Sequence, residues 1–225
     1  MSILIAGGSG FLGLKLCEAL KARGYFVHVI SRRAGGDPSS LMWSPDGTPG
    51  DLPSKLSGVH TVINLAGEGI ADRRWTAARK EAIRESRVLA TRTLVSAMAA
   101  CKAPPRVFIS SSAVGYYGPH GDEPVTEAAL PGSDFLARVC VEWEQEARAA
   151  ESDSTRVVLL RTGLPLSPDG GALAKLLLPF KLGVGGPLGN GRQWMPWVHV
   201  ADLVGLYLHA AGKDSIRGPM NSVAP

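Results

Sequence analysis

Four glycines near the start of the chain have types and spacing that suit contact with a phosphate group. Gly7, Gly8, Gly10 and Gly13 lie between a short aliphatic run and a stretch whose apolar residues recur at helical spacing. Glycine permits positive φ and a close approach of the backbone to a pyrophosphate, while the helix N-terminus offers free N–H groups. A Walker-type phosphate loop is excluded because Leu14 stands where its lysine would be. The pattern predicts a dinucleotide-binding strand–turn–helix unit; a purely structural turn is the alternative.

Two arginines bear on which dinucleotide would bind. Arg32 and Arg33 follow the aliphatic run Tyr25 to Ser31, and no acidic residue occurs until Asp37. Chains that prefer NAD place an acid at this strand end to hold the ribose 2′-hydroxyl, whereas a guanidinium can bind a 2′-phosphate in a forked geometry. Ser31, Arg32 and Arg33 therefore favour NADP(H), the alternative being a solvated basic pair.

A third arginine falls on the apolar stripe of a long predicted helix. Arg87 lies four residues after Ile83 and three before Ala90. An arginine on an inward face needs an anionic partner. A bound phosphate and a carboxylate on a neighbouring helix both fit this requirement.

Bulk composition excludes several classes of function. The 225 residues are enough for one sizeable core, and the net charge of +4 is scattered rather than gathered beside aromatic residues, so we expect no nucleic-acid partner. Cys17, Cys101 and Cys140 lack metal-ligand or CxxC spacing, which predicts reduced thiols, no metal site and a cytoplasmic location. We expect no membrane association, because no apolar run has transmembrane length and residues 1–10 are no signal peptide.

Short aliphatic runs and helical patterns alternate along the rest of the chain. The expected strands are residues 2–6, 25–31, 59–66, 106–110 and 156–161, with a possible edge strand at 41–43. The expected helices begin at about residue 14 and at 76, 134, 172 and 202, and residues 163–171 are expected to turn. Such alternation predicts an α/β fold, a doubly wound parallel sheet forming a single domain over residues 1–225.

Taken together, these motifs resemble the extended short-chain dehydrogenase/reductase superfamily, in particular its atypical sugar-nucleotide epimerase-like branch. The segments that carry the resemblance are GGSGFLG (7–13), SRR (31–33), NLAGEGI (64–70), RRW (73–75), ESR (85–87), SSSAVGYYG (110–118), RTG (161–163) and PWVHVADL (196–203). The resemblance spans essentially the whole chain and implies an NAD(P)-binding Rossmann fold. Members of this branch usually continue well beyond residue 225, so we expect part of the substrate pocket to be missing here.

The resemblance also implies which residues contact NADP(H). They are Gly7, Gly10, Phe11, Leu12, Gly13, Ser31, Arg32, Leu65, Ala66, Arg87 and Leu164. Most of them lie at predicted strand ends on the carboxyl edge of the sheet, where ligands bind in such folds.

The catalytic pair of this superfamily is missing. Working members use a tyrosine and a lysine four residues later, but no tyrosine of this chain has that lysine, and the corresponding helix reads FLARVC from Phe135. Ser112 matches the assisting serine and is a candidate to hydrogen-bond a substrate carbonyl. Tyr116 or Tyr117 is a candidate proton donor if a neighbour lowers its pKa. Alternatively, Ser112 satisfies backbone groups and both tyrosines anchor a loop.

Two features remain near the end of the chain. His199 is a catalytic candidate or, alternatively, satisfies a core hydrogen bond. A glycine-rich excursion over about 183–198 contains Arg192, Gln193 and Trp197, and either contributes to a substrate site or is an ordinary crossover loop.

The sequence supports two functions of different classes. One is an NADP-dependent oxidoreductase or epimerase-like enzyme that acts on a carbonyl or hydroxyl of an unknown small molecule. The other is a protein that binds NADP(H) without turnover, as a sensor or interaction protein. The missing tyrosine–lysine pair favours the second, while a full set of cofactor motifs suits both.

Overall fold

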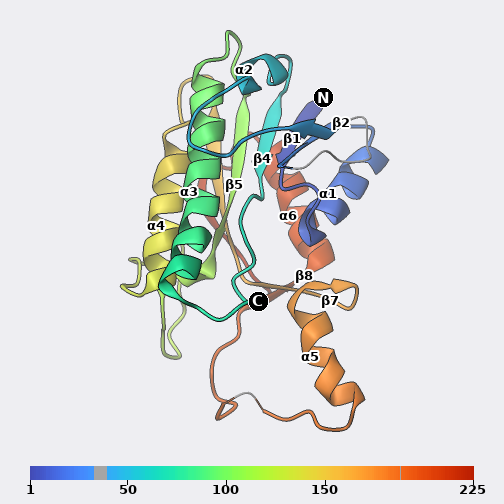
Figure 1. The fold of residues 1–225 in the computed structure, drawn as a ribbon, viewed down its shortest axis with the longest axis vertical. Helices are drawn as coiled ribbons and strands as arrows, with labels where there is room; N and C mark the ends of the chain where they lie inside the picture. The colour runs from blue at the N-terminus through green and yellow to red at the C-terminus, as the bar shows by residue number, and fades with distance from the viewer. Residues whose placement is uncertain (33–39, 188) are drawn as a thin grey trace.

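A seven-stranded parallel sheet forms the centre of the molecule (Figure 1). The structure is a computed structural model that describes residues 1–32, 40–187 and 189–225. The strand order is β3-β2-β1-β4-β5-β6-β9, and every neighbouring pair is parallel. The strands are β1 (Ser2–Ala6), β2 (Phe26–Ser31), β3 (Ser40–Met42), β4 (Thr61–Asn64), β5 (Val107–Ala113), β6 (Arg156–Thr162) and β9 (Gly218–Ser222). The predicted doubly wound α/β fold is confirmed.

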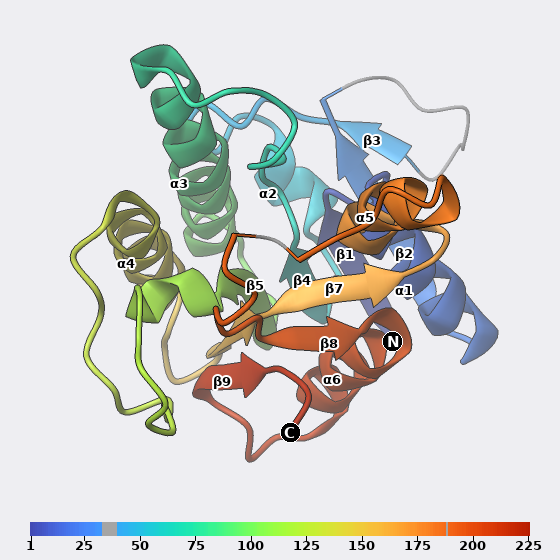
Figure 2. The ribbon, with the colours of Figure 1, turned by 90° about the horizontal axis from the view of Figure 1, so that it is seen from below.

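Helices cover both faces of this sheet, as Figure 2 shows from below. One face carries α1 (Phe11–Ala22) and α6 (Val200–Gly212). The other carries α2 (Leu52–Lys55), α3 (Ala77–Ala99) and α4 (Phe135–Arg148). A parallel sheet covered on both sides needs apolar residues at every position of its strands, which explains the unbroken aliphatic runs of the sequence.

Strand β1 shows how one run serves two cores. Ile3 and Ile5 pack in the cluster that includes α1 and α6, whereas Leu4 and Ala6 pack in the cluster that includes α3. All four side chains are completely buried. Successive residues of a strand point to opposite faces, so the five-residue run joins both cores.

The chain reverses its direction of travel across the sheet between β1 and β4. From β1 it moves outward through β2 to β3, and then returns to pair β4 with the other side of β1. The carboxyl ends of β1 and β4 therefore diverge into loops on opposite faces, and this switch point is where open α/β sheets bind ligands.

The starts of α3 and α4 agree closely with the sequence patterns, whereas α1 begins at Phe11, three residues before the expected position. The side chain of Thr76 accepts a hydrogen bond from the Arg79 backbone at the start of α3, and Asp134 accepts one from Ala137 at the start of α4. Such caps satisfy backbone donors that the helix itself leaves open. Helix α6 begins at Val200, two residues earlier than expected, because the side chain of His199 accepts from the Ala201 backbone.

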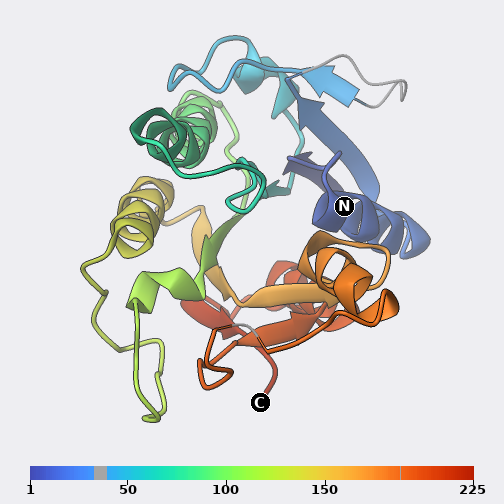
Figure 3. The same ribbon diagram turned by 60° about the horizontal axis from the view of Figure 1, so that its bottom comes forward.

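Four of the described α-helices and strands were not among those expected from the sequence, namely α2, β7 (Leu164–Ser167), β8 (Trp197–His199) and β9. The sequence pattern predicts a turn over residues 163–171, but they include strand β7, which pairs in parallel with β8 in a separate two-stranded sheet. Four residues with a proline among them carry too little periodicity to predict a strand. Between these strands in the sequence, α5 (Gly171–Lys181) projects away from the body of the molecule (Figure 1), and it lies on the side of α1 rather than on that of α3 and α4 (Figure 3).

Candidate functional site

The glycine turn after β1 is shaped by contacts that exclude side chains. Gly7 has a φ of 80°, and a Cβ atom there would lie 2.9 Å from the carbonyl carbon of Leu65. A Cβ at Gly13 would lie 2.4 Å from the carbonyl oxygen of Gly7 and 2.6 Å from the Cα of Gly8. Both glycines are thus required by the fold. Gly7 has a positive φ and lies against the segment that leaves β4, and Gly13 lets α1 start directly against the turn that precedes it.

Gly10 is different. Among the described residues, and apart from its two chain neighbours, a Cβ atom there would come within 4 Å of a single atom, the Gly7 carbonyl oxygen at 3.4 Å. Gly10 caps α1 without any side-chain hydrogen bond, so the first N–H groups of the helix, those of Phe11, Leu12 and Gly13, have no capping side chain. A bare backbone and uncapped amides together form a site for an anion.

A cleft of about 400 Å³ opens beside this turn, at the carboxyl ends of β1, β2 and β4. It is lined by Gly7, Ser9, Gly10, Ile30, Ser31, Arg32, Trp43, Pro45, Leu65, Ala66, Gly67 and Ser86. Six of the proposed cofactor residues are therefore brought together, namely Gly7, Gly10, Ser31, Arg32, Leu65 and Ala66.

Other expected cofactor residues do not line this cleft. Leu12 packs against the core cluster of α1 and α6, and the Phe11 ring lies against Gly170 at the start of α5. Leu164 is the first residue of β7. Their proposed roles in cofactor binding stay predictions.

Sequence reasoning missed part of the lining. Trp43 follows the edge strand β3, where its backbone N–H donates to the Ser31 carbonyl at 3.2 Å, and Pro45 lies just beyond it. Ser86 comes from α3. Trp43 stands in the short apolar island that predicted β3, but nothing in the local pattern indicates that it reaches a cleft.

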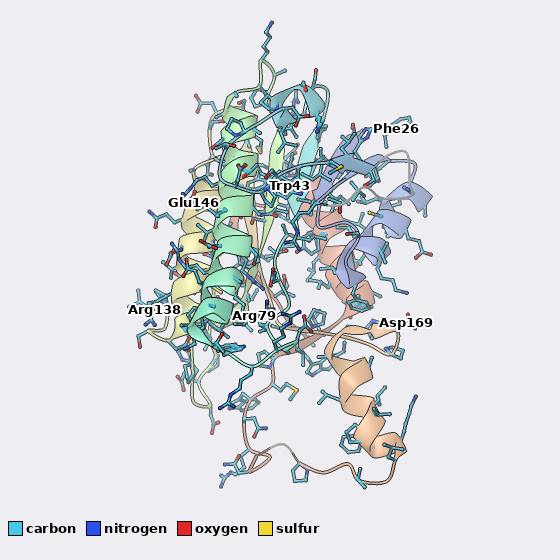
Figure 4. All side chains as sticks on the ribbon, viewed as in Figure 1. Phe26, Trp43, Arg79, Arg138, Glu146 and Asp169 are labelled. Atoms are coloured by element: carbon cyan, nitrogen blue, oxygen red, sulfur yellow. The ribbon has the colours of Figure 1, made fainter. Side chains whose placement is uncertain are left out.

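Arg32 lies at the mouth of the cleft, with 66% of its side chain exposed. Its Nη1 is 3.9 Å from Oε1 of Glu68, and Glu68 also forms an ion pair with Arg79 of α3. Arg33 and Asp37, which entered the sequence argument for NADP(H), lie outside the described residues. In Figure 4, Arg79 lies near the start of α3, beside the segment that leaves β4.

Arg87 points inward, as its place on the apolar stripe predicts. Its Nη1 donates to the Ile83 carbonyl and its Nη2 to the Glu68 carbonyl, both at 2.9 Å, and its guanidinium lies over the Trp143 ring at 5.4 Å. Burial lowers the pKa of Arg87. Within the described ranges, the partners of Arg87 are carbonyl oxygens and an aromatic face. A carboxylate on a neighbouring helix, one of the two partners expected from the sequence, does not pair with it there.

A second polar centre lies at the carboxyl end of β5. Ser112 is 3% exposed, and its Oγ donates to Oε1 of Glu144 on α4 at 2.7 Å. Glu144 forms a two-pronged ion pair with Arg161 of β6, with both N···O distances 2.8 Å. Ser112 thus contacts a carboxylate rather than backbone groups, and its catalytic role stays a prediction.

Both candidate tyrosines pack on Arg161. The short 3-10 helix Val114–Tyr117 carries them. The Arg161 guanidinium lies 3.5 Å from the centre of the Tyr116 ring and donates to the Tyr117 hydroxyl at 2.9 Å. The Tyr117 hydroxyl in turn donates to Oδ1 of Asn221 at 2.6 Å. Tyr116, by contrast, has no hydrogen-bond partner for its hydroxyl within the part of the chain that the structure describes.

The start of α4 has no groups for a tyrosine–lysine proton relay. Phe135 is its first residue, and its ring meets Trp75 edge to face at 5.5 Å. Val139, four residues on, is buried.

His199 accepts a hydrogen bond from the Ala201 backbone N–H at 3.3 Å and so serves as the cap of α6 described above.

Some common site types find no support in the structure. Across residues 1–32, 40–187 and 189–225, no group of three His, Cys, Asp or Glu side chains is arranged to hold a metal ion. Over the same ranges, no helix combines the length and the apolar character needed to cross a membrane.

Comparisons with known proteins agree with this geometry. The family model "NAD dependent epimerase/dehydratase family" matches residues 3–221. The epimerase family protein SDR39U1 of Bos taurus is 40% identical over 228 residues, a match that covers this chain completely and 75% of that protein. An epimerase family protein of Mycobacterium bovis is 41% identical over 223 residues, covering 99% of this chain and 73% of that protein.

Solved structures give the same result. The crystal structure of human SDR39U1 (isoform 2) with NADPH has a TM-score of 0.89 and 35% identity, and the match covers all of this chain and 75% of that one. The nucleoside-diphosphate sugar epimerase of Corynebacterium glutamicum has a TM-score of 0.87 and 38% identity, with 46% of that chain covered. This chain thus spans about three quarters of the length of the first relatives.

Proposed function

The chain belongs to the NAD dependent epimerase/dehydratase family, and on this premise we propose that it binds NADP(H) in the cleft beside β1. We propose further that it acts as an oxidoreductase or epimerase-like enzyme on a carbonyl or hydroxyl of a small molecule. The observation that carries the proposal is the cleft itself, where a bare glycine turn and a cation lie at the switch point of the sheet.

The residues of the turn fit a dinucleotide. Gly10 leaves space for a pyrophosphate at the uncapped start of α1, and Gly7 and Gly13 let strand, turn and helix approach closely enough to form that space. Leu65 and Ala66 line the facing wall. In this proposal the amides of the α1 N-terminus hold the pyrophosphate.

Preference for NADP(H) over NAD(H) rests on Arg32. It follows directly on β2, at the strand end where an NAD-specific chain carries an acid, and its largely exposed guanidinium can form a forked contact with a 2′-phosphate. The human structural neighbour with NADPH, at 35% identity, is consistent with this choice.

A bound nicotinamide would supply the hydride chemistry, so the chain must hold the substrate and move a proton. Tyr116 is the better candidate for proton transfer, because its hydroxyl is unengaged within the described residues and its ring lies against the Arg161 cation. Ser112 already donates its only proton to Glu144, so it would contact a substrate as a hydrogen-bond acceptor unless the pair rearranges.

A second function is a dinucleotide-binding protein without turnover. Phe135 and Val139 stand on α4 where the superfamily resemblance expects tyrosine and lysine. Together with the engaged Ser112 hydroxyl, this favours binding without catalysis. The three free cysteines suit a reducing compartment such as the cytoplasm under either function.

Calorimetric titration of the purified chain with NADPH and NADH tests the proposed site. We expect binding of both, with NADPH bound more tightly. NADPH consumption with a panel of aldehydes, ketones and nucleotide sugars then separates the two functions. Turnover that Tyr116→Phe abolishes supports the enzyme, whereas tight binding without turnover supports the binding protein. Failure to bind either dinucleotide would contradict both.

A further inference from the structure

Glu68 lies between two arginines at the mouth of the cleft. Its carboxylate faces Arg32, which follows β2, and pairs with Arg79, which comes from the first turn of α3. We propose that Glu68 tunes the cofactor preference by competing with the 2′-phosphate for Arg32, and that Arg79 weakens this competition. The inference rests on the NADP(H) site proposed above and names a residue that determines its specificity.

The backbone of Glu68 is held in place from α3. Its N–H donates to the hydroxyl of Ser86 at 3.1 Å, and its carbonyl accepts from Arg87 at 2.9 Å. Arg87 also packs beneath the preceding residue, since a Cβ atom at Gly67 would lie 3.2 Å from the Arg87 guanidinium carbon. The Glu68 side chain therefore starts from a fixed point beside two lining residues of the cleft, Gly67 and Ser86.

The two carboxylate oxygens of Glu68 have different partners. Oε2 is hydrogen-bonded by Arg79, whose side chain is only 13% exposed and also donates to the Gly69 carbonyl. Oε1 faces Arg32 at 3.9 Å, which is beyond hydrogen-bond distance. Arg79 thus holds the carboxylate through a hydrogen bond, whereas Arg32 is attracted to the same carboxylate without a hydrogen bond between the two side chains.

This arrangement affects the two cofactors differently. A 2′-phosphate is doubly charged near neutral pH, so it is attracted by Arg32 and repelled by Glu68. The 2′-hydroxyl of NADH carries no charge, and a carboxylate can accept a hydrogen bond from it. Glu68 consequently lowers the affinity for NADPH and leaves that for NADH nearly unchanged. Arg79 offsets part of the carboxylate charge and so moves the balance back towards NADPH.

The test compares dissociation constants for NADPH and NADH, measured by calorimetry at about 50 mM and 500 mM salt. Glu68→Gln keeps the shape of the side chain and removes its charge. We expect NADPH to bind about three- to tenfold more tightly to this variant at low salt, with NADH changed less than about twofold, and a smaller gain at high salt. Glu151→Gln is the matched control, because this exposed residue lies in the connection from α4 to the amino end of β6, whereas the cleft lies at the carboxyl ends of β1, β2 and β4.

Arg79 provides an independent arm of the experiment. Arg79→Met should weaken NADPH binding more than NADH binding, and this loss should be clearly smaller when Glu68→Gln is already present. Circular dichroism verifies that each variant is folded. If the unsubstituted chain binds NADPH and Glu68→Gln binds it equally well, the inference is overturned and the proposed function stands. If the unsubstituted chain binds no dinucleotide, both are overturned.

Discussion

Ser112 and Glu144 are joined by a hydrogen bond of 2.7 Å between two residues that are each 3% exposed. A serine hydroxyl has one proton to donate, so this bond directs the O–H group of Ser112 towards α4, which carries Glu144. Glu144 in turn neutralises Arg161, on which both tyrosines pack. One buried ion pair, Glu144–Arg161, thus contacts three catalytic candidates, Ser112, Tyr116 and Tyr117.

The first prediction concerns that ion pair. Glu144→Ala leaves the Arg161 guanidinium buried without a counter-charge, and loss of one partner of a buried pair costs about 3–5 kcal/mol. We expect the free energy of unfolding in urea to fall by that amount. Glu142→Ala is the matched control on the same helix, because its partner Arg84 is 37% exposed and such surface pairs contribute at most about 1 kcal/mol. Equal losses in the two variants would contradict the prediction.

The second prediction separates two glycines of the same turn. Gly13→Ala places a methyl group 2.4 Å from the Gly7 carbonyl oxygen, so α1 must move and we expect a loss of roughly 1–3 kcal/mol in stability. Gly10→Ala meets nothing closer than 3.4 Å, in an extended conformation that alanine adopts readily. We expect Gly10→Ala to fold with a loss of about 1 kcal/mol or less, but to bind NADPH at least about tenfold more weakly, because the methyl group enters the proposed pyrophosphate space.

Thermal unfolding and NADPH titration of both variants measure these effects. Gly205→Ala serves as the control for an alanine that fits. Gly205 lies inside α6, and, apart from its two chain neighbours and the backbone of that helix, no atom of the described residues lies within 4 Å of the position that a methyl group would take. This substitution should therefore raise stability by about 0.5–1 kcal/mol. A Gly10→Ala variant that binds NADPH normally would show that the turn does not hold the pyrophosphate.

The third prediction concerns Arg32. Arg32→Ala should weaken NADPH binding about tenfold, the lower end for a charged hydrogen bond because this side chain is largely exposed, and leave NADH binding within about twofold. Calorimetric titration with both dinucleotides measures the difference. Equal weakening of the two would mean that Arg32 does not contact the 2′-phosphate.

Much of the fold could be predicted because its signals are local. The runs that became β1 and β4 are buried on both faces, and Thr76 and Asp134 mark helix starts through their capping side chains. The strand β7 was missed because its stability comes from pairing with β8, some thirty residues away in the sequence. A strand of four residues is too short to show a hydrophobic periodicity that would indicate such pairing.

The site was predictable to the extent that backbone geometry defines it. Glycine spacing and strand ends brought Gly10 and Arg32 to one cleft. What sequence reasoning could not supply is the choice among partners for long polar side chains. Glu144, which engages Ser112, lies in no motif that singled it out, and although Glu68 lies in the NLAGEGI segment, that motif does not indicate that its side chain faces Arg32. In both cases the partner comes from another element of the fold.

The last prediction is a pH dependence that involves Cys140. Burial, with a further contribution from the nearby Glu144 carboxylate, raises the pKa of the Cys140 thiol to about 11 from an ordinary value of 9.0. Between pH 9 and 11 the unfolded thiol loses its proton while the folded thiol keeps it. The folded state then binds more protons than the unfolded state, so stability falls as the pH rises. From pH 8 to pH 10 this single group should lower the free energy of unfolding by roughly 1.3 kcal/mol. Urea unfolding of the unsubstituted chain and of Cys140→Ala at both pH values isolates the effect, because the variant lacks it while sharing every other titration. An identical decrease in the two proteins would show that Cys140 ionises as readily in the folded chain as in the unfolded one.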